Sequence, residues 1–211
     1  MKLILPFVLL FTTFSLYAEE NSNSDFKHSV SFGFDLATTG SFEDGESDDI
    51  TGPFDSELIF DSGLSIGYEY FEAKEESWGK GFGVSYHNSR EVEELVIDGE
   101  DYDITGDAAE ITLLKVYANL IYRWNTFYIP FGVNITSVSY EPPSSYDGSV
   151  ESTGGLGFNF GLGWFVTEQF AIEYMGSSNI WTLEAKSDSS ETDYGDGVLA
   201  VATLKLKYIF K

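Results

Sequence analysis

Residues 155–164, Gly-Leu-Gly-Phe-Asn-Phe-Gly-Leu-Gly-Trp, show the pattern that decides the fold. Every second residue from Leu156 to Trp164 is large and apolar, and every residue between them is Gly or Asn. Side chains of a β-strand point alternately to its two faces, so the pattern predicts a strand with one apolar face and one face of very small side chains. Eight runs of sequence show this type of alternation, at 29–36, 58–70, 78–87, 114–124, 127–136, 155–164, 170–181 and 198–210.

The composition of the two faces distinguishes a membrane barrel from a soluble one. A soluble barrel points its apolar face inward and carries many charges on the other face. Here the less apolar face is mostly Gly, Ser, Asn and Ala with a few charges, which suits a narrow interior, and the other face suits lipid. Strands in a bilayer must close on themselves, because no water is present to satisfy an open sheet edge. The sequence therefore predicts an all-β fold, an eight-stranded antiparallel up-and-down transmembrane β-barrel.

The connections between the predicted strands alternate in length, as they do in transmembrane barrels. The long connections contain most of the acidic residues and a single lysine, Lys186. Large aromatic residues flank every short connection, where an interfacial aromatic girdle belongs. We expect the long loops to be extracellular and the short turns periplasmic. The long loops are predicted at 39–57, 91–107, 141–154 and 184–196, and the short turns at 73–77, 125–126 and 167–169. Within 91–107, Asp98-Gly99 is suited to a tight hairpin turn.

Charge and composition exclude several classes of function. The 211 residues include 11 Lys+Arg and 35 Asp+Glu, a net charge of −24, which argues against binding to nucleic acid. The absence of cysteine excludes thiolate metal sites, a cysteine nucleophile, a disulfide scaffold and a lipid-modified cysteine. The length allows one domain, and the high aromatic content argues against a disordered chain.

The N-terminal segment has the order of a secretory signal peptide. Lys2 supplies a positive charge, a largely apolar run covers 3–16, and Ala18 precedes a polar stretch. The apolar run is shorter than the ~20 residues that a membrane-spanning helix needs. We therefore predict a signal peptide at 1–18 and an outer-membrane β-barrel domain at 19–211.

Three segments carry a resemblance to a known family. Residues 155–174 resemble the sixth strand, turn and seventh strand of small bacterial outer-membrane barrels of the OmpA, OmpX and OmpW type. Residues 128–133 resemble the strand that precedes these elements. The segment Tyr208-Ile209-Phe210 is similar to the C-terminal aromatic signal that the barrel-assembly machinery reads, although Lys211 follows it here. The resemblance implies an eight-stranded barrel in the bacterial outer membrane, in contact with outer-membrane lipid, lipopolysaccharide and the assembly machinery.

Strand parity predicts a network of charged side chains inside the barrel. Both signs are present, which favours paired charges that plug a narrow lumen over a selective pore. We expect Glu173 to pair with Lys207 or Lys205, and Glu69 to pair with Arg123. The predicted lumen charge network consists of Asp35, Asp61, Glu69, Lys115, Arg123, Glu173, Lys205 and Lys207. Inward apolar residues, such as Leu113 and Ile121, leave a narrow conduit for small or apolar solutes as the alternative.

Two motifs raise the question of chemistry. His87-Asn88-Ser89 has the His-x-Ser spacing of outer-membrane lipid A deacylases and phospholipases, but parity turns His87 inward and no acid is evidently placed to orient it. The segment 101–106 is similar to the start of a calcium loop, although its twelfth position is Thr112. We expect solvated acidic loops, with possible loop-bound divalent cations beside anionic lipopolysaccharide.

The sequence predicts a monomeric barrel with a structural or surface-interaction role, acidic extracellular loops and a largely plugged lumen. No catalytic, cofactor-binding or metal-binding residue is assigned, and the protein is not expected to be an enzyme. A narrow porin-like or OmpW-like channel is the first alternative. A lipid-modifying outer-membrane enzyme is the second.

Overall fold

A computed structural model describes residues 26–47, 52–104, 106–187 and 191–211, and the predicted signal peptide at 1–18 lies outside these ranges. Within them no helix is long and apolar enough to span a membrane. The described residues form the strands β1 (Lys27–Ser47), β2 (Phe54–Phe60), β3 (Gly63–Phe71), β4 (Ser77–Ile97), β5 (Glu100–Asp103), β6 (Glu110–Trp124), β7 (Phe127–Glu141), β8 (Gly148–Phe165), β9 (Phe170–Ser187) and β10 (Glu191–Phe210).

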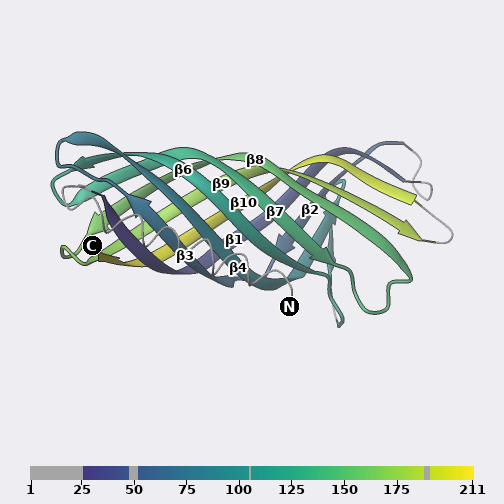
Figure 1. The fold of residues 1–211 in the computed structure, drawn as a ribbon. Helices are drawn as coiled ribbons and strands as arrows, with labels where there is room; N and C mark the ends of the chain where they lie inside the picture. The colour runs from purple at the N-terminus through teal and green to yellow at the C-terminus, as the bar shows by residue number, and fades with distance from the viewer. Residues whose placement is uncertain (1–25, 48–51, 105, 188–190) are drawn as a thin grey trace.

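The strands close into the predicted eight-position antiparallel barrel. Sequential strands pair around the ring from β6 to β10, and β10 closes the ring by pairing with β1. β2 and β3 share one position, because both pair with β1 on one side and with β4 on the other. β5 pairs with the end of β4 in a hairpin. The strands run obliquely along the barrel, and the C-terminus lies at the end with the short turns (Figure 1).

The alternating apolar and small or polar residues of each strand lie on the outside and the inside of the barrel, respectively. Phe158 and Phe160 are 73% and 64% exposed, whereas Asn159 between them is 5% exposed. In β6 and β7, Leu120 and Phe131 are likewise exposed, as predicted. A barrel with this exterior presents a continuous apolar belt to lipid.

Aromatic rings form a girdle at the short-turn end of the barrel. Trp78 and Tyr122 lie 4.9 Å apart between ring centroids, and Phe170 and Tyr208 lie 5.3 Å apart. Further ring contacts join Tyr122 to Trp124, Trp124 to Phe127, Phe127 to Trp164, Tyr208 to Phe210, and Phe210 to His28. This is the predicted position for aromatic residues at a membrane interface.

The strands continue well beyond the boundaries predicted from the sequence. Much of the predicted loops 39–57 and 184–196 is strand, since β1 runs to Ser47 and β10 begins at Glu191. Inward-facing apolar side chains in these segments pack together, which holds the strands in place above the belt. The predicted turn is confirmed: Asp98 and Gly99 have φ of 51° and 81°, and Ile97 pairs with Glu100 across them. We call the parts above the belt the strand extension, residues 41–47, 54–60, 91–104, 106–110, 137–151, 182–187 and 191–197.

Three neighbouring strand positions contain an irregularity at the same level. β1 shifts register between Asp35 and Ala37, the break between β2 and β3 falls at residues 61–62, and β4 shifts between His87 and Arg90. The levels match, because Asp35 pairs with Gly63 just below the break. An extra residue exchanges the faces of everything that follows it in a strand. In these three strand positions, parity counted from the short-turn end therefore fails above this level.

Candidate functional site in the barrel interior

The interior is filled in layers, with polar residues between two apolar clusters. The inward residues of β9 show the order: Ala171 is apolar, Glu173, Ser177 and Asn179 are polar with Met175 among them, and Trp181 is apolar again. The cluster toward the long-loop end, here the upper cluster, consists of Phe42, Leu58, Phe60, Val92, Ala109, Ile111, Leu113, Val138, Trp181, Leu183, Leu199 and Val201. The cluster toward the short-turn end, here the lower cluster, consists of Phe71, Ile121, Tyr128, Phe165, Ala171 and Ile209.

Trp181 is central to the upper cluster. Its side chain is fully buried, and its ring centroid lies 4.7 Å from that of Phe42 and 6.2 Å from that of Phe60. Its indole nitrogen donates to Ser152 Oγ at 2.9 Å, so the polar edge of the ring is also satisfied. Gly40 lies directly against the ring, where a Cβ would come 2.1 Å from it. The upper cluster therefore fills the barrel across its width.

The polar layer next to the lower cluster holds Glu173 between two lysines. Its carboxylate lies 3.3 Å from Lys205 Nζ and 3.1 Å from Lys207 Nζ, and it accepts a hydrogen bond from the Tyr128 hydroxyl at 3.0 Å. Lys207 also contacts Glu69. All of these side chains are buried. Glu173 thus contacts both lysines that the sequence offered as its alternatives.

The predicted pair of Glu69 and Arg123 is wrong. The Arg123 guanidinium lies 4.6 Å from the centroid of the Phe165 ring, at the short-turn end, and donates to the carbonyls of Ala73 and Asn125. Glu69 lies farther from the barrel end than Arg123 does and forms an ion pair with Lys207 instead. Backbone carbonyls at the barrel mouth satisfy the guanidinium, so it needs no carboxylate.

A second charged group lies beside the upper cluster and centres on Asp35. Arg90 Nη2 lies 2.6 Å from its carboxylate, the Thr203 hydroxyl donates to it at 2.6 Å, and His87 Nδ1 lies 2.9 Å away. Arg90 also donates to Thr38. Sequence reasoning assigned no role to Arg90, because the bulge at 88–89 turns it inward. The two adjacent outward polar residues, Asn88 and Ser89, are the signal that could have found this bulge.

The predicted inward position of Asp61 is also wrong. Asp61 is exposed, in the break between β2 and β3, and its amide donates to the carbonyl of Glu91 at 2.9 Å. The prediction extended the alternation of β3 backward from Gly63 to Asp61. The alternation holds as far as Gly63, but it does not continue across the break. Phe60 takes the next inward position and joins the upper cluster.

His87 has an orienting acid, contrary to the sequence interpretation. Because ionised Asp35 only accepts hydrogen bonds, His87 donates from Nδ1, and Nε2 lies 3.1 Å from Ser85 Oγ. The order Ser85, His87, Asp35 is that of a hydrolase triad. Ser89 of the His-x-Ser motif is not part of it, since its hydroxyl donates to Glu110 on the exterior.

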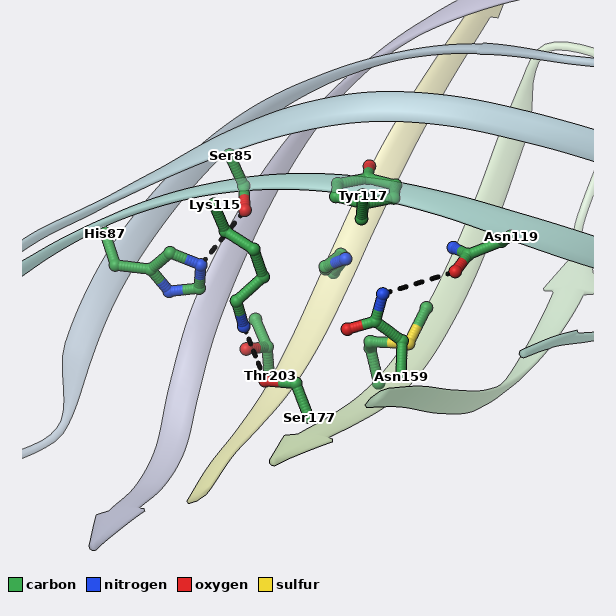
Figure 2. Close-up of a pocket in the computed structure, with 10 residues that line it drawn as sticks. Ser85, His87, Lys115, Tyr117, Asn119, Asn159, Ser177 and Thr203 are labelled. Atoms are coloured by element: carbon green, nitrogen blue, oxygen red, sulfur yellow. Dashed lines mark hydrogen bonds between the residues drawn. The ribbon is translucent and has the colours of Figure 1, made fainter. Parts of the chain in front are cut away.

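A small cavity lies between the two charged groups (Figure 2). Its volume is about 10 Å³, roughly the space for one water molecule. Dashed lines in Figure 2 join Ser85 to His87, Lys115 to Ser177, and Asn159 to Asn119 around it. The cavity is bordered by Ser85, His87, Lys115, Tyr117, Asn119, Asn159, Met175, Ser177, Thr203 and Lys205.

The strand extension has a strongly acidic exterior. Lys186 is the single Lys or Arg in its described ranges; it lies 3.1 Å from Glu191 and also contacts Glu184. Its hydrogen bonds to these carboxylates raise its pKa. The exposed carboxylates are Glu43, Asp44, Glu46, Asp55, Glu91, Glu93, Asp98, Glu100, Asp101, Asp107, Glu141, Asp147, Glu151, Glu191, Asp193 and Asp196.

No group of three or more His, Asp or Glu side chains in the described part of the chain is arranged to hold a metal ion. Within the calcium-like segment, Thr105 lies outside the described residues, as do Asp48 and Asp49 in the first acidic loop. Loop-bound divalent cations therefore stay a prediction.

No family model matches the chain, and no curated protein matches it. The solved structures that are similar to it include the following three. The outer membrane protein OprG from Pseudomonas aeruginosa is 16% identical over 86% of this chain and 96% of its own, with a TM-score of 0.44. Neisserial surface protein A is 14% identical over 88% and 97%, with a TM-score of 0.44. Yersinia pestis outer membrane protein Ail, in a phospholipid bilayer nanodisc, is 16% identical over 87% and 99%, with a TM-score of 0.41.

The barrel's own surface defines its environment. A closed ring of eight antiparallel strands with an apolar exterior and an aromatic girdle is the architecture of bacterial outer-membrane proteins. The chain is an outer-membrane β-barrel.

Proposed function

We propose that this protein is a closed, non-conducting barrel that acts at the cell surface through its acidic strand extension. The observation that carries the proposal is the blocked interior: an apolar cluster closes each end, and paired charges fill the space between. With the interior blocked, the strand extension is the part of the described barrel that is available to bind a partner. Long loops of outer-membrane barrels face the outside of the cell, so the extension is extracellular.

A cationic partner is the chemistry that the extension fits. Its carboxylates are carried on paired strands with an apolar core beneath them, so they form a firm surface rather than a set of free loops. Such a surface attracts cationic peptides or proteins from a distance and holds divalent cations near lipopolysaccharide phosphates. Tyr208 and Phe210 remain our proposed signal for the barrel-assembly machinery, and we propose a monomer.

A channel is less consistent with the interior than a plug. Eight strands leave an interior that side chains can fill, and here the cavity between the charged groups has a volume of about 10 Å³. Solute passage would require both apolar clusters to open. The buried Trp181 makes that costly at the upper cluster.

The hydrolase alternative has a geometric argument in Ser85, His87 and Asp35, but the site has no room for a substrate. The bordering cavity has space for about one water molecule, and acyl transfer needs a carbonyl carbon beside the serine with oxyanion donors around it. We propose that these three residues form a structural hydrogen-bond network, and that the protein is not an enzyme.

Binding of a cationic probe to cells tests the surface role. Fluorescent poly-lysine is applied to intact cells that display the wild type or a triple variant at the hairpin tip, Asp98→Asn, Glu100→Gln and Asp101→Asn. A matched control neutralises three exposed acids at the short-turn end, Glu75→Gln, Glu76→Gln and Glu168→Gln.

We expect the tip variant to bind several-fold less probe than the wild type at low ionic strength, because surface attraction falls with charge and is screened by salt. The short-turn control should bind as much as the wild type. Equal binding by the wild type, the tip variant and cells without the protein would contradict the proposal.

A further inference from the structure

The buried charges of the interior do not balance. The buried cationic side chains are Arg90, Lys115, Lys205 and Lys207, and the buried carboxylates are Asp35, Glu69 and Glu173. Cations therefore exceed carboxylates by one among the described buried residues. His87 does not change the sign, because it is either neutral or adds a further positive charge. A buried charge without a partner is costly, so the excess is removed either by loss of a proton from the unpaired cation or by a bound anion, and only the second makes stability depend on the anion present.

Lys115 is the cation without a carboxylate. Arg90 forms an ion pair with Asp35, and Lys205 forms one with Glu173. Lys207 forms ion pairs with both Glu69 and Glu173. Within the described residues Lys115 forms no ion pair, and its ammonium group donates to the hydroxyl of Ser177. Lys115 is 5% exposed, so bulk water does not solvate it.

The cavity beside Lys115 has the lining of an anion site. Two lysines border it, Lys115 and Lys205, and no Asp or Glu does. Asn119 also borders the cavity and is only 3% exposed. Its side-chain Nδ2 has no hydrogen-bond partner among the described residues. Ser177 also borders the cavity, and its hydroxyl keeps a proton to donate because its oxygen accepts from Lys115, whereas the Thr203 hydroxyl already donates to Asp35. An unsatisfied buried donor and an unpaired cation at one cavity both point to an acceptor with negative charge.

The size of the cavity limits the ligand to a single atom. Its volume of about 10 Å³ is roughly one water-sized sphere, which excludes phosphate, sulfate and carboxylates. We propose that the barrel interior binds one halide ion, chloride under physiological conditions, between Lys115, Lys205 and Asn119. The ion is a structural counter-ion that completes the charge balance of the plug.

Two apolar clusters enclose the site, so the ion exchanges slowly and is taken up as the barrel closes. The full-length protein is therefore folded and crystallised in sodium bromide, whose anion scatters anomalously. We expect an anomalous peak within hydrogen-bond distance of Lys115 Nζ. A cavity without such a peak, with bromide only at the surface, overturns the proposal.

Stability provides a second test. Unfolding is followed in sodium chloride and in sodium gluconate, whose anion is too large for the cavity, at equal ionic strength. We expect the unfolding temperature of the wild type to rise by about 4 °C per tenfold increase in chloride above the dissociation constant. The variant Lys115→Met removes the charge at nearly constant length and should lose this response, whereas Lys80→Met on the exterior should keep it.

The same response in the wild type and Lys115→Met overturns the proposal, as does a wild type that responds equally to chloride and gluconate. If Lys115→Met does not fold, the bromide map of the wild type decides alone.

Discussion

Glu173 is the carboxylate on which the lower charged layer depends, and replacing it with glutamine tests whether the interior is held by paired charges. It lies 3.3 Å from Lys205 and 3.1 Å from Lys207, and all three side chains are buried. Glu173→Gln keeps the shape of the side chain and removes only its charge. Lys207 retains Glu69, whereas Lys205 loses its one carboxylate among the described residues.

The magnitude follows from this difference between the two lysines. Removing one partner of a buried ion pair costs roughly 3–5 kcal/mol, because the other charge stays buried and unpaired. We expect a value near the lower limit, about 3 kcal/mol, since only Lys205 is left without a carboxylate. For a chain of this length that loss lowers the unfolding temperature by roughly 6–12 °C.

A double-mutant cycle separates charge pairing from a general packing defect. Glu173→Gln combined with Lys205→Met removes both charges, and we expect most of the lost stability to return. Glu69→Gln is the matched control, because Lys207 keeps Glu173, and it should cost about half as much as Glu173→Gln.

Equilibrium unfolding by guanidinium in detergent micelles, followed by tryptophan fluorescence, measures these free energies. The reasoning is refuted if Glu173→Gln is within about 0.5 kcal/mol of the wild type, which is the ordinary range for a surface substitution. It is also refuted if the double variant is less stable than Glu173→Gln alone.

Three further predictions concern other parts of the molecule. Trp181→Ala should lower the free energy of unfolding by about 3–5 kcal/mol, because it opens a cavity in the upper cluster. Unfolding in guanidinium measures this loss, and a smaller loss would mean that the cluster is loosely packed. Protease added to intact cells should cut within 91–107 and spare 73–77, and the opposite result would invert the topology. Hydrogen bonds from Ser144 lower the pKa of Asp107, so this contact should be present at neutral pH and be lost as the pH falls through that lowered pKa. The protection factor of the Ser144 amide, its exchange rate relative to that of an unstructured peptide at the same pH, should fall at acid pH in the wild type, whereas a pH-independent protection factor would contradict the contact.

The strand pattern was sufficient to predict the barrel because each membrane-spanning segment has to alternate. Phe158, Asn159 and Phe160 lie on the predicted faces, and the turn at Asp98-Gly99 has the predicted conformation. Lipid on one side and a narrow interior on the other leave little freedom in these segments, so local sequence determines the face.

Above the belt the same reasoning fails for a physical reason. Asp61 was assigned inward by parity, but a break after Phe60 exchanges the faces, and the turn-forming residues Asp61, Ser62 and Gly63 were the signal for this break. The bulge before Arg90 likewise hid the ion pair with Asp35. At the opposite, short-turn end, the contacts of Arg123 depend on carbonyls of two turns, which strand alternation does not describe.

The central claim is that the barrel is closed, and electrical recording from planar lipid bilayers tests it most directly. The purified wild-type protein should insert without producing a steady conductance, because the upper cluster, the paired charges and the lower cluster each block a continuous water path. A large, steady conductance that scales with the number of inserted barrels would contradict the account and make the protein a channel.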